Sequence, residues 1–241
     1  MTDRIAQAVR VNAGSNGMLY DPAFAITPAL QVFEPAFYAE RARPVSAGGR
    51  NAAWFVQDQW GSGVLRQYRR GGLVARFNKS HYVWNGAENT RSFAEFRLLQ
   101  YMHARGLPVP RVVAAGYNRS LFFYRAALIT ETLPNTRPLA SVLKDLSDTV
   151  EITALAEACA RSIYLMHKAN VWHADLNAFN LLVDASNKVW LIDFDKGRQL
   201  VMTASLCNDN LNRLKRSLEK VLQQQGLVFW EHLSRFYAKN Q

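Results

Sequence analysis

The sequence predicts an α+β chain, with a small antiparallel sheet and one helix in a first lobe and a mainly helical second lobe. Segments of strand character surround a single helical segment, at 52–57, 63–68, 111–116 and 121–130 around 92–105. Two longer helical segments follow, at 149–168 and 210–225. Closely spaced carboxylates and amides stand between these two helices, from 173 to 195, and indicate a catalytic site there.

Glycines and prolines set the boundaries of the first lobe. The turn Gly61–Gly63 separates the first two strands, and the helix over 92–105 ends at Gly106, with two prolines just beyond it. Gly48 and Gly49 precede the first strand, where small residues would let backbone N–H groups approach phosphates. A plain turn is the alternative interpretation of these two glycines.

Three segments of the chain have different characters. Residues 1–45 are apolar in places and repeatedly interrupted by proline, which predicts an irregular N-terminal arm. We expect the first lobe over 46–130 and a reduced second lobe over 131–241, the two forming one catalytic domain. In the second lobe, apolar residues recur at helical spacing over 149–168 and 210–225, and a short aromatic-rich helix is expected over 228–239.

Composition limits the partners of the chain without choosing among them. Its 29 Lys and Arg exceed its 19 Asp and Glu, so its surface should attract polyanions such as nucleotides, nucleic acid or anionic lipids. Two cysteines are too few for a disulfide framework. No run reaches the roughly 20 apolar residues of a membrane span, and the first residues show no secretory signal. We expect a cytosolic chain, or one held at a membrane surface without crossing it.

The spacing of three polar residues predicts a metal-assisted site. Asp175 and Asn180 are five residues apart, and Asp193 follows Asn180 by thirteen. Between Asn180 and Asp193, the runs 181–183 and 189–192 predict two short buried strands joined by a turn. Such a hairpin brings its ends together, so the oxygens of Asn180 and Asp193 would face one point, as Mg²⁺ requires. Asp175, just before the hairpin, could accept the proton of an attacking hydroxyl.

These residues resemble the catalytic core of the protein-kinase-like superfamily, whose signature is H-R-D-L-x-x-x-N followed by D-F-G. The carrying stretches are His173-Ala174-Asp175-Leu176-Asn177-Ala178-Phe179-Asn180 and Val189-Trp190-Leu191-Ile192-Asp193-Phe194-Asp195. The resemblance implies Asp175 as catalytic base, Asn180 and Asp193 as Mg²⁺ ligands and ATP as phosphate donor. It also implies that His173 is structural, bracing the loop.

The same resemblance extends to the first lobe. Arg66 stands where the family carries a phosphate-contacting Lys, and Glu95 stands at the position of the glutamate that holds this cation. Ser92-x-x-Glu95 is also a capping box, in which Glu95 would only tie down the start of the helix. The segment from Glu131 to Leu133 would be the hinge, with backbone amides that could pair with adenine.

Three departures argue against a protein substrate. Asn177 stands where protein Ser/Thr kinases carry Lys, and Asp195 replaces the Gly of D-F-G. A helix is expected about a dozen residues after Asp195, which leaves no room for a long activation segment. Only 46 residues follow Asp195, too few for a full protein-kinase second lobe. We therefore expect a small-molecule or lipid-linked sugar as acceptor.

The chain is similar to one family in particular, the 3-deoxy-D-manno-octulosonic acid (Kdo) kinases. Four blocks carry the similarity: 64–73, 173–180, 190–197 and 212–218. It implies the 4-hydroxyl of Kdo on Kdo-lipid IVA as acceptor, ATP with Mg²⁺, and peripheral attachment to the cytoplasmic face of a Gram-negative inner membrane.

Basic residues could bind the anionic acceptor. Arg69 and Arg70 precede two glycines, while Arg213, Arg216 and Lys220 form a cationic stripe on the predicted helix, unless they only solvate its face. Alternative functions are another small-molecule kinase of heptose or aminoglycoside type, a non-catalytic nucleotide-binding scaffold, or a nucleic-acid binder. The sequence contains no recognisable nucleic-acid-binding motif, so we expect no nucleic-acid partner.

Overall fold

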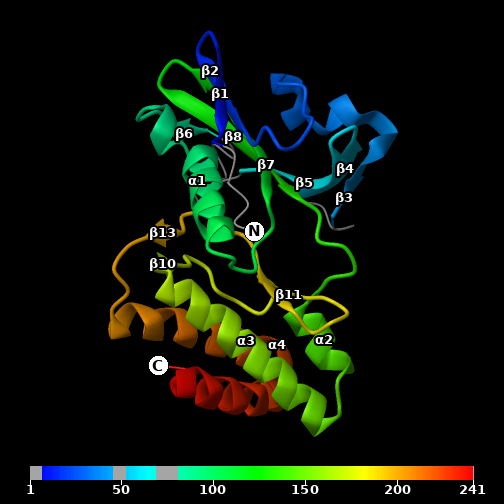
Figure 1. Ribbon diagram of the computed structural model, residues 1–241, viewed down its shortest axis with the longest axis vertical. Coiled ribbons are helices and arrows are strands. Elements are labelled where there is room, and N and C mark those ends of the chain that lie inside the picture. The colour runs from blue at the N-terminus through cyan, green and yellow to red at the C-terminus, as the bar shows by residue number, and fades with distance from the viewer. Residues whose placement is uncertain (1–6, 46–52, 69–80, 241) are drawn as a thin grey trace. The chain divides into compact units, whose positions relative to one another are not determined.

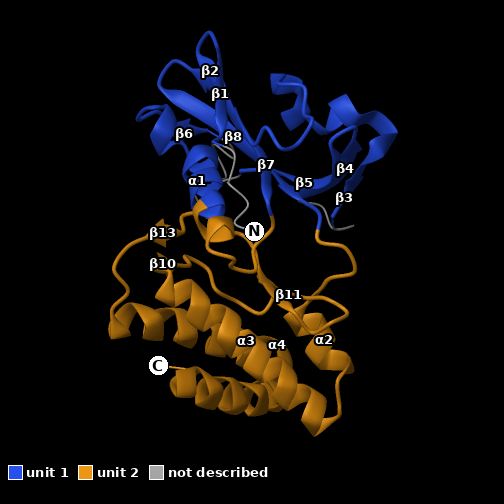
Figure 2. Ribbon diagram, viewed as in Figure 1, with its two compact units in different colours: residues 1–100, 111–132 blue, residues 101–110, 133–241 orange. Residues whose placement is uncertain are grey.

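The computed structural model describes residues 7–45, 53–68 and 81–240 of the chain. They form two compact units (Figure 2). The first comprises residues 1–100 and 111–132, and the second residues 101–110 and 133–241. An antiparallel sheet with one α-helix in the first unit and a mainly helical second unit confirm the predicted α+β class (Figure 1).

The first unit is built on an antiparallel sheet with the strand order β1-β2-β7-β8-β5-β4-β3, and β6 pairs with β8. Its strands are β1 (Val9–Ala13), β2 (Asn16–Tyr20), β3 (Ala42–Pro44), β4 (Ala53–Asp58), β5 (Gly61–Gln67), β6 (Tyr82–Val83), β7 (Val112–Ser120) and β8 (Phe123–Glu131). The central strands and helix α1 (Arg91–Ala104) follow the predicted segments closely.

Residues 9–44 are more regular than the irregular arm that the sequence predicts over 1–45. The hairpin of β1 and β2 joins the sheet edge at β7, and β3 joins the other edge at β4. Two 3₁₀ segments, Leu30–Phe33 and Pro35–Arg41, connect them. On one side β2 pairs with β1 in this hairpin, and on the other it pairs with β7, more than 90 residues away, which local patterns could not reveal.

Alternation along β5 gives the sheet two differently covered faces. Leu65 is buried in a core cluster with Val32 and Phe33 of the 3₁₀ segment. The next side chain, Arg66, points to the other face and pairs with Glu95 of α1. The strand therefore fixes an apolar contact and an ionic contact on opposite sides.

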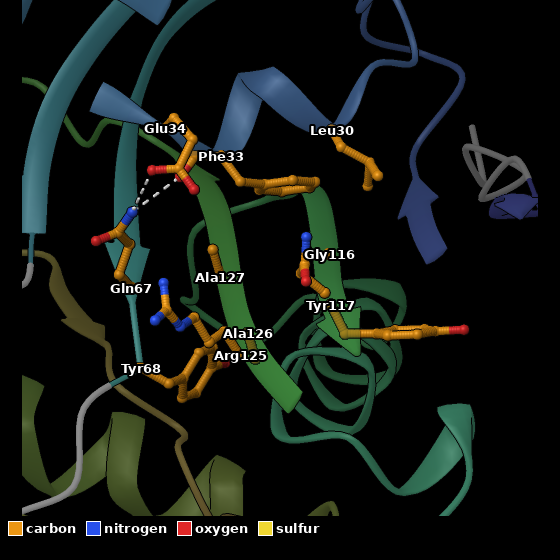
Figure 3. A pocket seen from close by; sticks show the side chains of 11 residues that line it. Leu30, Phe33, Glu34, Gln67, Tyr68, Gly116, Tyr117, Arg125, Ala126 and Ala127 are labelled. Atoms are coloured by element: carbon orange, nitrogen blue, oxygen red, sulfur yellow. Dashed lines mark hydrogen bonds between the residues drawn. The ribbon is translucent and has the colours of Figure 1, made fainter. Parts of the chain in front are cut away.

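A pocket of about 450 Å³ lies between the first 3₁₀ segment and the sheet, within the first unit (Figure 3). Gln67 faces it and donates to the Phe33 carbonyl at 3.1 Å and to Glu34 Oε2 at 3.2 Å. None of the described residues that line it was predicted for the site from the sequence, although Tyr68, which lines it, bonds Glu95.

The second unit consists of three helices and two small sheets. The helices are α2 (Leu139–Asp145), α3 (Thr149–Lys168) and α4 (Ala204–Asn240). Strands β12 (Val189–Leu191), β11 (Leu181–Val183) and β9 (Arg137–Pro138) form one sheet, and β10 (Val171–Trp172) pairs with β13 (Arg198–Gln199). Asp148 caps α3 by accepting from the N–H groups of Val150 and Glu151, at 2.6 and 3.1 Å.

Helix α4 contains both helices predicted over 210–225 and 228–239, with different bounds. It begins at Ala204 and continues to Asn240, with a break at Gln223, whose φ of 51° is left-handed. Figure 1 shows the two parts as separate coiled segments, orange and red. After the break, Gly226 lies against the Leu218 carbonyl, where an added Cβ would come within 2.3 Å of the oxygen. In the described ranges, no helix is long and apolar enough to cross a membrane.

Gly226→Ala should therefore lower the stability of the fold. In an ordinary helix this change stabilises by up to about 1 kcal/mol. Here the new methyl group meets a backbone carbonyl, and we expect a loss of about 1–3 kcal/mol instead. Urea denaturation checks the sign, with Gln224→Ala, an exposed position in the same segment, as control. A gain in stability for Gly226→Ala would show that the two helical parts are not in close contact.

Candidate active site

In the first unit, the partly buried Arg66 and the buried Glu95 and Tyr68 form one polar group. One guanidinium nitrogen of Arg66 bonds both carboxylate oxygens of Glu95, and the Tyr68 hydroxyl donates to the same carboxylate. The Arg66 guanidinium also lies 4.8 Å from the Tyr68 ring centre. Because Glu95 is only 4% exposed, its charge depends on these partners. The pairing of Arg66 with Glu95 is the one expected from the sequence.

Ser92 does not form the capping box that was the alternative for Glu95. Helix α1 begins at Arg91, so Ser92 lies inside its first turn and is not the cap residue. The Ser92 hydroxyl instead donates to the Gly116 carbonyl at 2.9 Å. Glu95 is therefore directed at β5 and not at the start of its own helix.

The structure narrows which backbone groups of the predicted hinge are available to a nucleotide. The N–H of Glu131 donates to the Arg111 carbonyl at 2.8 Å, and that of Thr132 donates to Ser62 at 3.0 Å. Strand β8 continues through Glu131, so two of the three backbone N–H groups of the predicted hinge are already bonded within the first unit. The sheet ends before Leu133, whose N–H remains the candidate donor. The other expected nucleotide contacts, Gly48 and Gly49, lie outside the described residues.

In the second unit, the predicted hairpin brings Asn180 and Asp193 together. Strands β11 and β12 pair antiparallel, with Leu181 opposite Leu191. Beyond this pair, the N–H of Ile192 donates to the Asn180 carbonyl at 3.1 Å. Asp193 follows directly with a left-handed φ of 61°, which an aspartate tolerates better than most residues. The hairpin thus fixes the backbone of both residues.

Asn180 is further oriented by the loop that precedes it, residues 173–180, which we call the catalytic loop. Its side-chain NH₂ donates to the Asp175 carbonyl at 2.9 Å, which leaves its amide oxygen for a cation. The chain as described holds no group of three or more His, Cys, Asp or Glu suited to a metal. Mg²⁺ needs no such cage, because one or two protein oxygens and substrate phosphates suffice for it. Asn180 and Asp193 therefore fit this ion.

Asp175 is the exposed carboxylate of the catalytic loop. Its side chain is 62% exposed, and Oδ1 lies 3.6 Å from a guanidinium nitrogen of Arg213 on α4. Its backbone N–H donates to Nδ1 of His173 at 3.0 Å. The backbone of Asp175 is thus held while its carboxylate stays accessible to a substrate.

His173 is a neutral structural residue, as expected from the sequence. Its Nδ1 accepts from the Asp175 N–H, so the proton is on Nε2, which donates to the Ile192 carbonyl at 3.0 Å. Burial lowers the pKa of His173, against the hydrogen bond to Ile192 and the neighbouring carboxylates. The ring therefore joins the catalytic loop to the end of the hairpin.

A buried chain of hydrogen bonds anchors this loop to α4. Asn210 donates from Nδ2 to the His173 carbonyl at 2.7 Å, and its Oδ1 accepts from the His173 N–H at 3.2 Å. These two bonds fix which end of the amide is oxygen, so Nε2 of His167 must donate to the same Oδ1, 3.2 Å away. Nδ1 of His167 then accepts from the Tyr237 hydroxyl at 2.7 Å. Both histidines are uncharged in this arrangement.

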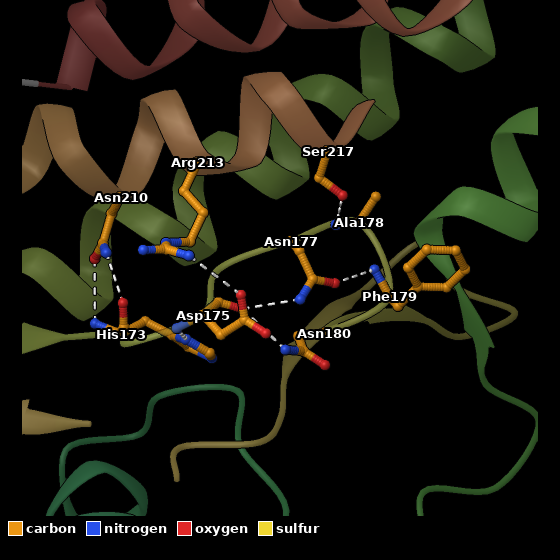
Figure 4. Close-up of polar contacts among 9 residues, drawn as sticks. All are labelled: His173, Asp175, Asn177, Ala178, Phe179, Asn180, Asn210, Arg213 and Ser217. Atoms are coloured by element: carbon orange, nitrogen blue, oxygen red, sulfur yellow. Dashed lines mark hydrogen bonds and ion pairs between the residues drawn. The ribbon is translucent and has the colours of Figure 1, made fainter. Parts of the chain in front are cut away.

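Three polar side chains on one face of α4 contact the catalytic loop. Asn210 bonds His173, Arg213 faces Asp175, and Ser217 accepts from the Ala178 N–H at 3.2 Å (Figure 4). Sequence reasoning missed the roles of Asn210 and Ser217 and placed Arg213 only in a cationic stripe. The available signal was their spacing of three and four residues on one helix face.

The stability of the protein should fall as His167 becomes protonated. Burial lowers the pKa of His167 from 6.5 to about 4, outweighing the hydrogen bond that His167 donates to Asn210. Because the pKa of His167 is lower in the folded than in the unfolded protein, the neutral ring contributes about 3 kcal/mol to the free energy of unfolding. This contribution is complete above pH 6.5 and is lost as the pH falls towards 4. Urea unfolding at several pH values would show a shallower fall for His167→Gln than for wild type. His103→Gln, at an exposed position, should keep the wild-type slope.

Known proteins similar to this chain are kinases of lipopolysaccharide. The model of the lipopolysaccharide kinase (Kdo/WaaP) family matches residues 35–237. A 3-deoxy-D-manno-octulosonic acid kinase of Xanthomonas euvesicatoria pv. vesicatoria (strain 85-10) is 45% identical over 230 residues, 95% of this chain and 90% of the relative. The enzyme of the same name from Xylella fastidiosa (strain M23) is 44% identical over 190 residues, 79% of this chain and 75% of the relative. The chain therefore belongs to the lipopolysaccharide kinase (Kdo/WaaP) family.

Proposed function

We propose that the protein transfers the γ-phosphoryl group of ATP to the 4-hydroxyl of Kdo on Kdo-lipid IVA, in lipopolysaccharide biosynthesis. The observation that carries the proposal is the exposed Asp175 carboxylate beside the hairpin that joins Asn180 and Asp193. The names of the similar proteins support Kdo as the acceptor sugar. The choice of hydroxyl and of the lipid-linked acceptor rests on the resemblance to the Kdo kinases.

Asp175 acts as the general base in this proposal. It takes the proton of the sugar hydroxyl while the hydroxyl oxygen bonds to the γ-phosphorus and the bond from that phosphorus to ADP breaks. Its exposure lets an acceptor reach the carboxylate, and the bond from its N–H to His173 holds the loop in place. Mg²⁺ held by Asn180 and Asp193 would neutralise charge on the phosphates.

Arg66 is proposed to contact the phosphates of ATP. The family position supports this role, and the pairing with Glu95 and Tyr68 keeps the guanidinium in one orientation. Arg is not equivalent to Lys here, since its planar fork can bind Glu95 and an anion through different nitrogens. The adenine contacts are assigned to the backbone of the hinge around Leu133.

The proposed place of action is the cytoplasmic face of the inner membrane, with the protein attached peripherally. The net charge of +10 supports attraction to anionic lipid and to an anionic glycolipid acceptor. A kinase of heptose or aminoglycoside type would share the site chemistry described above, so the acceptor must be tested directly.

Asp175→Asn should lower turnover by about 10²- to 10⁴-fold, because the amide cannot accept the hydroxyl proton. ATP affinity should stay close to wild type. The assay is phosphate addition to Kdo-lipid IVA, followed by mass spectrometry, with Asp209→Asn, an exposed aspartate on α4, as control.

Near-wild-type turnover of Asp175→Asn would remove this residue from the role of base. Transfer by the wild type to heptose or aminoglycoside acceptors, but not to Kdo-lipid IVA, would show that the proposed acceptor is wrong. Lack of both ATP binding and transfer would contradict the kinase proposal itself.

A further inference from the structure

The catalytic loop contains no cationic side chain of its own. Residues 173–180 include no Lys or Arg, and His173 is neutral because its Nδ1 accepts a hydrogen bond. Asn177 stands where protein Ser/Thr kinases have Lys. Its side chain serves the loop, donating to the Asp175 carbonyl at 3.0 Å and accepting from the Phe179 N–H at 2.8 Å. The positive charge next to Asp175 comes from another element.

Arg213 of α4 supplies that charge. Its guanidinium nitrogen lies 3.6 Å from Asp175 Oδ1, which is longer than a hydrogen bond. Arg213 and Asp175 are 45% and 62% exposed, so both can be reached by a substrate. A guanidinium has five N–H donors, and one loose contact with Asp175 leaves donors for a further anion.

The backbone of α4 is fixed on both sides of Arg213. Asn210, one turn before, bonds the main chain of His173 through two hydrogen bonds. Ser217, one turn after, accepts from Ala178. Arg213 therefore projects from a helix segment tied to the catalytic loop at two points, as Figure 4 shows.

We propose that Arg213 is a further catalytic residue that contacts the phosphoryl group during transfer. The proposal rests on the function given above. As the bond to ADP breaks and the bond to the sugar oxygen forms, negative charge spreads over the equatorial oxygens of the phosphoryl group. Asp175 takes the hydroxyl proton at the same point, and Arg213 stabilises the charge beside it. Removing one such preorganised donor costs about 10²- to 10³-fold in turnover in other enzymes.

The test compares Arg213→Gln and Arg213→Lys with Arg235→Gln, an exposed arginine near the end of the same helix. For Arg213→Gln we expect a loss of about 10²-fold in kcat, with little change in KM for ATP or acceptor. Arg213→Lys should recover part of it. Binding of ADP with aluminium fluoride, a mimic of the phosphoryl group in transfer, should weaken relative to ADP alone for Arg213→Gln only.

Four outcomes overturn the role. They are an unchanged kcat, a loss confined to the KM of the acceptor, a loss matched by thermal destabilisation, and unchanged binding of ADP with aluminium fluoride. A wild-type protein that phosphorylates no Kdo would instead contradict the proposed function, which separates the two failures.

An independent observation concerns the turn between β7 and β8 in the first unit. Its apolar side chains are strongly exposed, with Leu121 at 79%, Phe122 at 76% and Phe123 at 41%. Val83 of β6, 65% exposed, lies opposite Phe123 in the sheet. The Trp84 N–H donates to the Phe122 carbonyl at 2.8 Å, which ties the two segments together. Leu121, Phe122, Phe123 and Val83 thus form one apolar tip.

Aromatic rings and arginines follow directly behind this tip. Trp84 packs on Tyr117 and Tyr124, with ring centres 5.0 and 6.1 Å apart. The Arg119 guanidinium lies 4.7 Å from the Trp84 ring and donates to the Leu121 carbonyl at 3.0 Å. Arg125 follows Phe123 by two residues on β8 and donates to Nε2 of His81 at 3.2 Å. An apolar end, then aromatic rings, then cations is the order of side chains at a membrane interface.

We infer that the apolar tip inserts into the surface of an anionic lipid bilayer. Four side chains are too few for a stable protein interface, which usually buries more than about 1,000 Å². A bilayer has no such requirement, because each inserted apolar side chain contributes separately and each nearby cation adds attraction to anionic headgroups.

Sedimentation with vesicles of phosphatidylethanolamine and phosphatidylglycerol tests the inference on the full chain. The double change Leu121→Ser and Phe122→Ser should weaken binding about tenfold or more. The matched control is Val150→Ser with Val201→Ser, which removes two equally exposed apolar residues elsewhere. Phosphorylation of Kdo-lipid IVA dispersed in detergent should be unchanged in the tip variant. Equal vesicle binding by tip variant, control and wild type would overturn the inference, as would vesicle binding that does not depend on phosphatidylglycerol.

Discussion

The two hydrogen bonds between Asn210 and the main chain of His173 are the constraint on which the candidate site depends. All four polar atoms involved belong to buried residues, so none can readily find water if the contact opens. The same amide oxygen accepts from His167, whose other ring nitrogen bonds Tyr237. His167 therefore joins two residues near opposite ends of α4. The position of the catalytic loop is thus set by a helix residue that follows His173 by 37 positions.

In the first unit, a buried carboxylate is stabilised by a cation and a hydroxyl group. Burying Glu95 would be costly without a partner, and Arg66 and Tyr68 satisfy both of its oxygens. Arg66 can reach Glu95 because β5 alternates, with Leu65 in the apolar cluster on the opposite face. The apolar packing of one sheet face therefore determines which way the cation on the other face points.

Local patterns in the sequence were sufficient for the elements that carry the motif. Helix α3 and the hairpin of β11 and β12 follow their predicted segments, since periodicity and turn residues specify them within a few neighbours. The pairing of β2 with β7 and the hydrogen bonds of Asn210 could not be predicted in this way. Both depend on residues distant in the sequence, and a polar residue on a helix does not reveal its buried partner.

The catalytic loop separates its polar groups by charge and exposure. His173 and His167 are buried and neutral, and their hydrogen bonds require this, because a protonated His173 could not accept from the Asp175 N–H. Asp175 and Arg213 are exposed and charged, and the loop and α4 hold their backbones without occupying their side chains. The structural hydrogen bonds are thus made by buried groups, and the candidate reactive groups are the exposed ones. A loop arranged in this way can exchange a proton with a substrate at Asp175 without disturbing the bonds that hold it.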